Sequence, residues 1–305
     1  MMPASLTLTV PDACETIALA GGPYSNFAAV AAFLDATRDV THRYCLGDIG
    51  GFGPLPDRTL DLIRGAGLAC VQGNYDHAIG HGESDCGCGY IDPLDRHYAQ
   101  VSYDYTERHT SADHKAWLRE LPQQIRLEWR GQSLLLCHGS PDQVNEFVWA
   151  SETPAAKIAE WLARHRVTGI CATHSGLPWI RTVSGGGFWF NAGVLGRPAH
   201  EDSSRVFYGI VEFPHGAARP RPRLVELAYD PAPVAAAMRA EGLPEVFVES
   251  LLTGRWTTCA NILPPFERLP RDRLLGCSGA VPGEPARDDA RLAARPAEPV
   301  ADLAD

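Results

Sequence analysis

Four short apolar runs in this chain each end in a residue that can bind a metal ion. The runs YCLGD, LACVQGN, LLLCH and GICATH end at Asp48, Asn74, His138 and His174. Any one of these residues alone is common at a turn or a strand end, but the same context four times over favours a shared site. Apolar runs of this length beside glycine are typical of buried parallel strands, and ligands bind beyond the carboxyl ends of such strands. We therefore expect the four side chains to meet.

The expected donor set is one carboxylate, one amide and two imidazoles. Mixed oxygen and nitrogen donors suit Mn, Fe or Zn better than Ca or Mg. The sequence therefore predicts a site for a divalent transition metal ion.

Strand and helix patterns alternate in the first half of the chain. Strands are predicted over residues 16–21, 43–48 and 68–74, and helices over residues 25–39 and 56–65. The helix over residues 25–39 is predicted to have Ser25 as its N-cap. Alternation of this kind implies right-handed crossovers and a parallel sheet, so the fold class is α/β.

The second half of the chain has antiparallel patterns. Hairpins are predicted over residues 124–139 and 178–193, and further strands over residues 205–213 and 223–229. These patterns suit the second sheet of a two-sheet sandwich flanked by helices.

The composition changes at Trp256 toward Pro, Ala, Arg and acidic residues. Such a segment has too little apolar periodicity to offset the entropy of ordering it. We therefore expect one domain over residues 1–255 and a largely disordered tail over residues 256–305.

The formal net charge of −10 argues against nucleic acid as a partner, because nonspecific binding to phosphate backbones depends on Lys and Arg. A small phosphorylated molecule is the favoured partner. The nine cysteines are an odd number and do not form a disulfide framework of the small secreted kind. The N-terminal segment has neither a basic start nor a continuous apolar stretch, so no membrane anchor is predicted and the cytoplasm is the expected compartment.

Several sequence blocks together resemble those of the calcineurin-like metallophosphoesterases. The blocks LGDIGGFGP, VQGNYD, LLLCHGSP, ATHSGLPW and FNAGVLGRP follow one another in the family's order over about residues 16–255. The chain is most similar to the small bacterial phosphodiesterase-like branch. The resemblance implies a metallophosphoesterase-like sandwich, phosphoester hydrolysis, and metal ligands at Asp48, Asn74, His138 and His174.

The chain departs from the family pattern at three places. Tyr75 stands where the family has a His after the amide, although small branches of the family vary there. Gly22 and Tyr24 stand where the family has its Asp-x-His pair, and Cys171 and Ala172 replace the Gly and the first His of a GHTH block. The family pattern implies two ions, and two nearby ions need anionic ligands to offset their repulsion. Because one carboxylate is missing, we expect a single ion, held by the four ligands named above.

Other residues could complete the coordination. Tyr24 could bind as a phenolate, although we favour the interpretation that its ring fills the vacated volume. The Gly-rich loop over residues 76–90 offers Asp76, Cys86 and Cys88 as ligands for a softer ion, and it is equally typical of a surface loop.

Two further residues have predicted roles in catalysis and binding. His77 is a candidate proton donor to a leaving group if the loop folds over the metal. Arg197, in the GRP block, could pair with a phosphate as a bidentate donor, and Asn74 is expected to contact substrate as well as metal.

The leading hypothesis is a metal-dependent hydrolase of small phosphate esters with an altered, mononuclear site. His174 would bind the metal or steady the nucleophile. One alternative is a non-catalytic member that binds a phosphorylated ligand. Another is a site redirected to a thiophilic metal species by the Cys86 and Cys88 loop.

Overall fold

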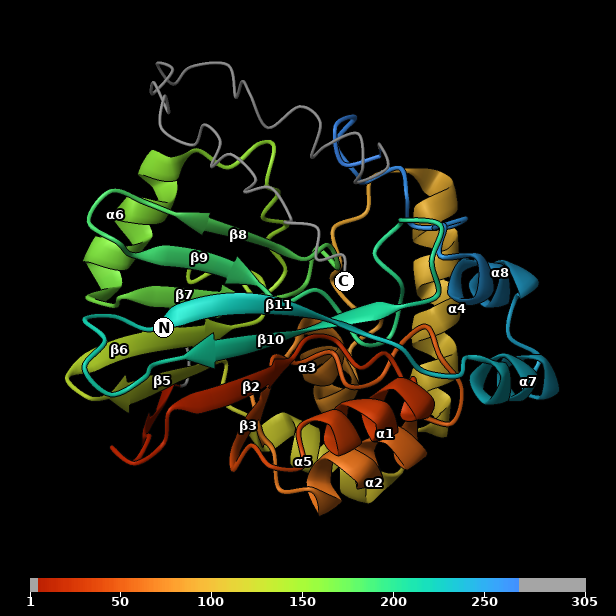
Figure 1. Ribbon diagram of the computed structural model, residues 1–305. Helices are drawn as coiled ribbons and strands as arrows, with labels where there is room; N and C mark the ends of the chain where they lie inside the picture. The colour runs from red at the N-terminus through yellow and green to blue at the C-terminus, as the bar shows by residue number, and fades with distance from the viewer. Residues whose placement is uncertain (1–4, 269–305) are drawn as a thin grey trace, which may run out of the picture. The chain divides into compact units, whose positions relative to one another are not determined.

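Two mixed β-sheets and eight helices make up the part of the chain that the computed structural model describes, residues 5–268 (Figure 1). The part of the predicted tail from residue 269 onward lies outside these residues. The six-stranded sheet has the order β1-β5-β6-β7-β9-β8, and the five-stranded sheet has the order β11-β10-β2-β3-β4. The strands of the first sheet are β1 (Ser5–Thr9), β5 (Gln124–Trp129), β6 (Gln132–Cys137), β7 (Gly169–Ala172), β9 (Phe188–Asn191) and β8 (Trp179–Thr182). Those of the second are β11 (Arg221–Leu227), β10 (Val206–Glu212), β2 (Thr16–Ala20), β3 (His42–Cys45) and β4 (Ala69–Cys70).

The two sheets pack face to face through alternate residues of their strands. Ile17 and Leu19 of β2 share one buried cluster with Leu134 and Leu136 of β6, whereas their neighbours in sequence face outward. Both faces of these strands are therefore buried, which explains why their sequences are continuous apolar runs. This arrangement confirms the predicted two-sheet α/β sandwich.

Helices cover the outer face of each sheet. Those on the five-stranded side are α1 (Phe27–Ala36), α2 (Pro56–Gly65), α3 (Asn74–His81), α4 (Pro93–His109) and α5 (Ala112–Glu120), and all five contribute to the cluster over that sheet. Helix α6 (Ala155–His165) packs on the six-stranded sheet through Ile158 and Trp161. Helices α7 (Ala232–Ala240) and α8 (Glu245–Thr253) form a further cluster with Phe27 and Tyr105.

Each sheet contains a run of three neighbouring parallel strands. Strands β2, β3 and β4 run parallel, as do β6, β7 and β9. The loops after β3, β6 and β7 carry Asp48, His138 and His174, and Asn74 is the first residue of α3, which follows β4. The donors therefore come from two facing sheets rather than from one open sheet.

Four details of the sequence prediction need correction. The cap of α1 is Asn26, whose side-chain oxygen accepts a hydrogen bond from the amide of Ala29, not Ser25. The segment expected to be a Gly-rich loop begins as helix α3. Strand β1 and helix α4 were not predicted, although the N-cap Asp92 followed by proline is a recognised start signal for α4.

The fourth concerns residues 256–268, which the sequence analysis assigns to the tail. They belong to the same compact unit as the rest of the described chain. Trp256 and Leu263 are buried in a cluster with Trp149 and Leu177. The packed domain thus continues past residue 255.

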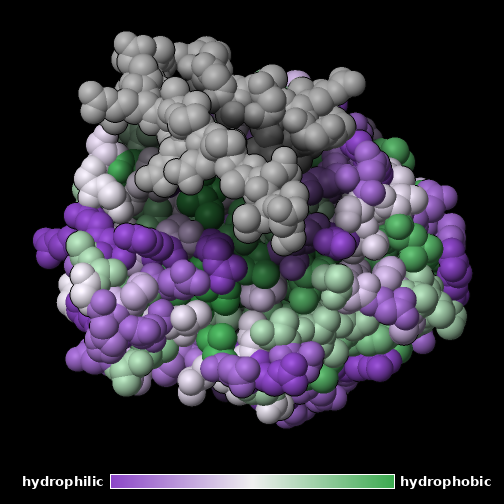
Figure 2. Space-filling model, in the orientation of Figure 1, coloured by the Kyte–Doolittle hydropathy of each residue, from purple (hydrophilic) through white to green (hydrophobic). Residues whose placement is uncertain are grey.

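The coloured part of the surface in Figure 2 has hydrophilic and hydrophobic residues interspersed over one face. None of the described helices combines the length and apolar character needed to cross a membrane.

Candidate metal centre

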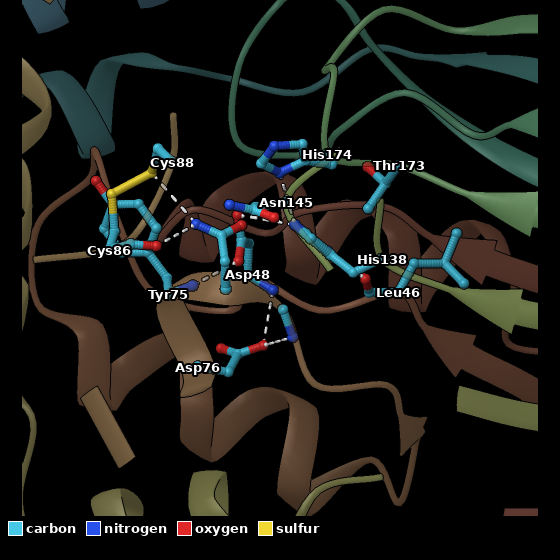
Figure 3. Close-up of polar contacts among 12 residues, drawn as sticks. Leu46, Asp48, Tyr75, Asp76, Cys86, Cys88, His138, Asn145, Thr173 and His174 are labelled. Atoms are coloured by element: carbon cyan, nitrogen blue, oxygen red, sulfur yellow. Dashed lines mark hydrogen bonds and ion pairs between the residues drawn. A yellow bond between two sulfur atoms is a disulfide. The ribbon is translucent and has the colours of Figure 1, made fainter. Parts of the chain in front are cut away.

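Asp48, His138 and His174 converge at the edge shared by the two sheets (Figure 3). Each offers one ligand atom, and these atoms lie within 4.8 Å of one another. Nε2 of His138 is 3.1 Å from Oδ2 of Asp48 and 3.2 Å from Nδ1 of His174. All three side chains are buried, with at most 7% of their surface exposed. Buried carboxylate and imidazole groups at this spacing are the donor chemistry of a transition metal site.

The backbone at two of these donors is held in an unusual conformation. Asp48 has φ 56° and His174 has φ 52°, both in the left-handed region that non-glycine residues seldom adopt. Such conformations persist only where the surrounding structure enforces them, and they concentrate at functional sites. The loops after β3 and β7 are therefore shaped to turn these side chains inward.

The protonation of His138 is set by its partners. Its Nδ1 is 2.7 Å from the carbonyl oxygen of Leu46. Because a carbonyl only accepts, Nδ1 carries a hydrogen, and the lone pair of Nε2 faces Asp48 and His174. Burial lowers the pKa of His138, but the Asp48 carboxylate outweighs it and raises the pKa above its ordinary value. A cation is thus favoured at this point, whether a proton or a metal ion.

The surroundings of His174 lower its pKa, whereas those of His138 raise the pKa of that residue. Burial, followed by the nearby His138, lowers the pKa of His174 to about 3. Its ring is therefore neutral near neutral pH, which is the state needed in a metal ligand. Nε2 of His174 is buried and makes no hydrogen bond. The ring also lies against Phe147, with centroids 4.4 Å apart.

Asn74 has an oriented amide with an unpaired oxygen. Its Nδ2 donates to the carbonyl oxygen of Cys86 at 2.8 Å and to Sγ of Cys88 at 3.2 Å. Because both partners accept hydrogen bonds, the amide NH2 group must face them, and Oδ1 points to the opposite side. Oδ1 is buried and has no hydrogen-bond partner, which is costly unless a ligand occupies that direction. This orphaned oxygen fits a metal ligand.

Asp76 is not a ligand of this centre. Its carboxylate accepts hydrogen bonds from the backbone amides of Asp48 at 2.7 Å, Ile49 at 3.0 Å and Gly73 at 2.8 Å. It therefore ties the loop after β3 to the start of α3. Burial and the nearby Asp48 carboxylate raise the pKa of Asp76 to about 6 in spite of these bonds. The prediction of Asp76 as a replacement ligand is corrected, because its oxygens are already occupied.

Cys86 and Cys88 form a disulfide bond. Both sulfurs are thereby unavailable as thiolates, so the predicted role of these residues as metal ligands does not apply to this form of the protein. Their loop instead contacts Asn74 directly.

The position of the missing Asp-x-His pair is filled by an aromatic ring. A Cβ atom at Gly22 would lie 2.7 Å from Cε1 of Tyr24, and one at Gly196 would collide with Cβ of the same residue. The Tyr24 ring is thus seated between two glycines. Burial, with the Asp48 charge adding to it, raises the pKa of Tyr24 far above its ordinary value, so the hydroxyl stays protonated. These observations agree with the space-filling interpretation of Tyr24.

The other predicted site residues lie apart from the donor cluster. The ring nitrogens of His77 face Gln72, at 3.1 Å, and Glu83, at 3.3 Å. Arg197 is buried, donates to the carbonyl oxygen of Thr258 and stacks over Trp256 at 4.2 Å. The structure therefore does not bring His77 or Arg197 together with Asp48, His138 and His174.

Some supporting residues were missed by sequence reasoning. The backbone amide of Tyr75 donates to Oδ1 of Asp48 at 3.0 Å, and the carbonyl of Leu46 orients His138. Such backbone contacts leave no trace in residue type. Asn145, from the loop after β6, donates to the carbonyl of Gly87 at 2.6 Å and also had no sequence signal.

The fold is similar to those of solved structures of other proteins. No family model matches the chain. The structure is similar to a metallophosphoesterase from Sphaerobacter thermophilus, with a TM-score of 0.60 and 24% identity over 79% of this chain and 99% of that one. It is similar also to a hypothetical protein from Pyrococcus horikoshii, with a TM-score of 0.66 and 18% identity over 78% of this chain and 98% of that one.

One curated protein also matches in sequence. An uncharacterized protein of Methanocaldococcus jannaschii is 28% identical over 127 residues, which span 41% of this chain and 49% of the relative. The match thus covers about half the length of that relative. The structural likeness shows that the chain shares the fold of the metallophosphoesterase from Sphaerobacter thermophilus, so the predicted fold is confirmed.

Proposed function

We propose that this protein is a metal-dependent hydrolase of small phosphate esters, with one divalent transition metal ion held by Asp48, Asn74, His138 and His174. The single observation that carries the proposal is the buried, unpaired Oδ1 of Asn74 beside a converging carboxylate and two imidazoles. A fold that leaves a buried acceptor unpaired loses about 1–3 kcal/mol. A bound cation would recover this loss.

The residues present fit such an ion by their chemistry. Asp48 supplies the negative charge, and Nε2 of His138 presents a lone pair because its other nitrogen donates to Leu46. His174 is neutral near neutral pH, as a metal ligand must be. An ion bound there would act as a Lewis acid on a phosphoryl oxygen and attract an anionic ester.

The chain's own groups would then orient the ester and hold protons. Nε2 of His174 has no close hydrogen-bond partner among residues 5–268, so it could hydrogen-bond an oxygen of the ester. Asp76 keeps the backbone of Asp48 in place through its carboxylate. Phe147, whose ring lies 4.4 Å from that of His174, gives the site an apolar wall.

The test uses protein freed of metal by chelation and reloaded with Mn²⁺, Fe²⁺, Co²⁺, Ni²⁺ or Zn²⁺ in turn. We expect metal-dependent release of p-nitrophenolate from p-nitrophenyl phosphate or bis(p-nitrophenyl) phosphate. Asp48→Ala should abolish it. Asp39→Asn, which removes an exposed carboxylate away from the site, is the matched control and should leave the rate unchanged. No hydrolysis with any of these ions would contradict the proposal.

A second candidate function is supported by the Tyr24 ring. That ring occupies the side of the site next to Gly22, where the family pattern places ligands of a second ion. A protein with one ion could bind a phosphorylated ligand without cleaving it. Binding of Mn²⁺ in the absence of hydrolysis would favour this non-catalytic function over the first.

A further inference from the structure

The loop that carries Cys86 and Cys88 touches the candidate metal centre through Asn74. Nδ2 of Asn74 donates to the carbonyl oxygen of Cys86 and to Sγ of Cys88, at 2.8 and 3.2 Å. Figure 3 shows the Cys86–Cys88 disulfide on the Asp48 side of the donor cluster, with His138 and His174 beyond it. No other hydrogen bond of the Asn74 side chain exists in the described residues, since its Oδ1 is unpaired. The orientation of the amide thus depends on this loop.

The loop is anchored at its base, and its tip is closed by the disulfide. Tyr103 donates to the carbonyl of Glu83 at 2.7 Å, and Gln100 donates to that of Ser84 at 3.0 Å, so α4 holds the base. Beyond it, both cysteines are buried while Gly87 between them is exposed. The two side chains therefore point inward and the backbone of Gly87 faces solvent.

We propose that the Cys86–Cys88 disulfide is a redox-dependent positioning element for Asn74, which makes the affinity of the site for its metal ion depend on thiol oxidation state. The inference rests on the proposed metal site. In the oxidised form the carbonyl of Cys86 and the sulfur of Cys88 hold the amide so that Oδ1 faces the ion.

Reduction acts on Asn74 through the sulfur of Cys88. A dithiol such as dithiothreitol transfers two electrons and two protons to the disulfide, the S–S bond breaks, two thiols form, and the dithiol closes to its own cyclic disulfide. Two sulfurs that are no longer bonded cannot remain at covalent distance. The sulfur of Cys88 is itself an acceptor of the Asn74 amide, so its displacement on reduction removes this contact and loosens the amide.

The experiment measures the dissociation constant of Mn²⁺ on the full chain by electron paramagnetic resonance of the free ion. Mn²⁺ is the probe because it prefers oxygen and nitrogen donors and gains little from free thiols. The oxidised protein should bind Mn²⁺ about 10- to 100-fold more tightly than the reduced protein, the range expected for loss of an outer-shell partner. Reoxidation should restore the affinity, and thiol alkylation after denaturation reports the state of the pair.

Three variants separate positioning from mere structural support. Cys86→Ser with Cys88→Ser should bind Mn²⁺ like the reduced protein and no longer respond to dithiothreitol. In Asn74→Ala, which lacks the amide, reduction should have no further effect on affinity. Cys14→Ser, at a partly exposed free cysteine, is the control and should keep the full redox response.

The outcomes distinguish the inference from the proposed function. Equal Mn²⁺ affinity of oxidised and reduced protein, or tighter binding after reduction, overturns the inference and leaves the metal site standing. A redox response that persists in Asn74→Ala overturns the positioning role. Failure of both forms to bind Mn²⁺ overturns the metal site and the inference together. A change in thermal unfolding on reduction, without a change in affinity, would assign the disulfide to fold stability alone and also overturn the inference.

Discussion

The two sides of the candidate metal centre differ in polarity: one contains buried polar atoms and the other a packed aromatic ring. On the side of β3, β4, β6 and β7, polar atoms converge and some are left unpaired, notably Oδ1 of Asn74. On the side of β2, the corresponding space holds the Tyr24 ring, seated against Gly22 and Gly196.

This contrast has an energetic meaning. An unpaired buried acceptor costs about 1–3 kcal/mol, whereas a packed aromatic ring carries no such cost. At the candidate metal centre, the unpaired oxygen of Asn74 lies where an ion could compensate this cost. Where ligands are absent, apolar packing has closed the space.

The strongest test of this contrast is to remove the Asp48 carboxylate from the polar side. Asp48→Ala deletes the carboxylate that faces His138 and accepts from Tyr75. We expect Mn²⁺ affinity to fall by more than the roughly 10- to 100-fold that loss of an outer-shell partner costs. Calorimetric titration measures it, and circular dichroism checks that the variant is folded. An unchanged affinity would mean that Mn²⁺ binds at another place on the protein.

The pH dependence of metal binding provides a second test. A metal ion must displace any proton from Nε2 of His138, whose pKa is raised by Asp48. Affinity should therefore fall as pH drops through that raised pKa, by about tenfold per pH unit for one displaced proton. His138→Gln should flatten the profile. A wild-type profile that is flat between about pH 8 and pH 6 would contradict this assignment.

In the metal-free protein, the contribution of His138 to the free energy of unfolding should decrease as pH rises, whereas metal affinity should increase. Asp48 stabilises protonated His138 in the folded state only, and the pKa of His138 is therefore raised in the folded protein. Its contribution to the free energy of unfolding is therefore full below the ordinary histidine pKa and is lost as pH rises through the folded value. Thermal unfolding of metal-free wild type and His138→Gln, compared across this range, measures the difference. A His138 contribution that grows with rising pH would be inconsistent with the ion pair.

The apolar side is tested by returning a side chain to Gly22. Gly22→Ala places a Cβ atom 2.7 Å from Cε1 of Tyr24 and 3.0 Å from Cγ1 of Val194, so we expect a loss of about 1–3 kcal/mol in unfolding free energy. Tyr24→Ala in the same chain should relieve part of it, with a coupling of about 0.5–3 kcal/mol in a double-mutant cycle. Urea denaturation measures all four corners of the cycle.

Gly65→Ala is the matched control for this cycle. It lies at the end of α2, and a Cβ atom there would meet nothing within 4 Å. It should be neutral or slightly stabilising. Additive effects of Gly22→Ala and Tyr24→Ala would mean that the ring does not hold the vacated space.

The same contrast explains how much of the centre the sequence could predict. Asp48, His138 and His174 follow apolar strands, and strand ends of parallel segments converge by simple geometry, so their meeting was predictable. The orientation of Asn74 was not, because it is set by a carbonyl and a sulfur at residues 86 and 88. Residue type alone also marked Asp76 as a ligand, although its oxygens bind backbone amides.

The fold was predictable to a similar degree. Alternating strands and helices gave the two-sheet sandwich, because burial on both faces imposes continuous apolar runs. Residues 256–268 were assigned to the tail since their packing depends on contacts distant in sequence, such as the bond from the Trp256 indole to the carbonyl of Pro198 at 2.6 Å. Composition cannot report contacts of this kind.

The smallest expected effect is that of Tyr24→Phe, which removes only the hydroxyl from the apolar side. Burial and the Asp48 charge keep this hydroxyl protonated, because they raise the pKa of Tyr24. A protonated phenol is a poor metal ligand, so Mn²⁺ affinity should change by less than about twofold, or about 0.4 kcal/mol. Loading wild type with Fe³⁺ should likewise produce no phenolate-to-iron absorption band. A tenfold loss of affinity, or such a band that disappears in Tyr24→Phe, would show that Tyr24 has replaced the missing ligand and that both sides of the centre bind metal.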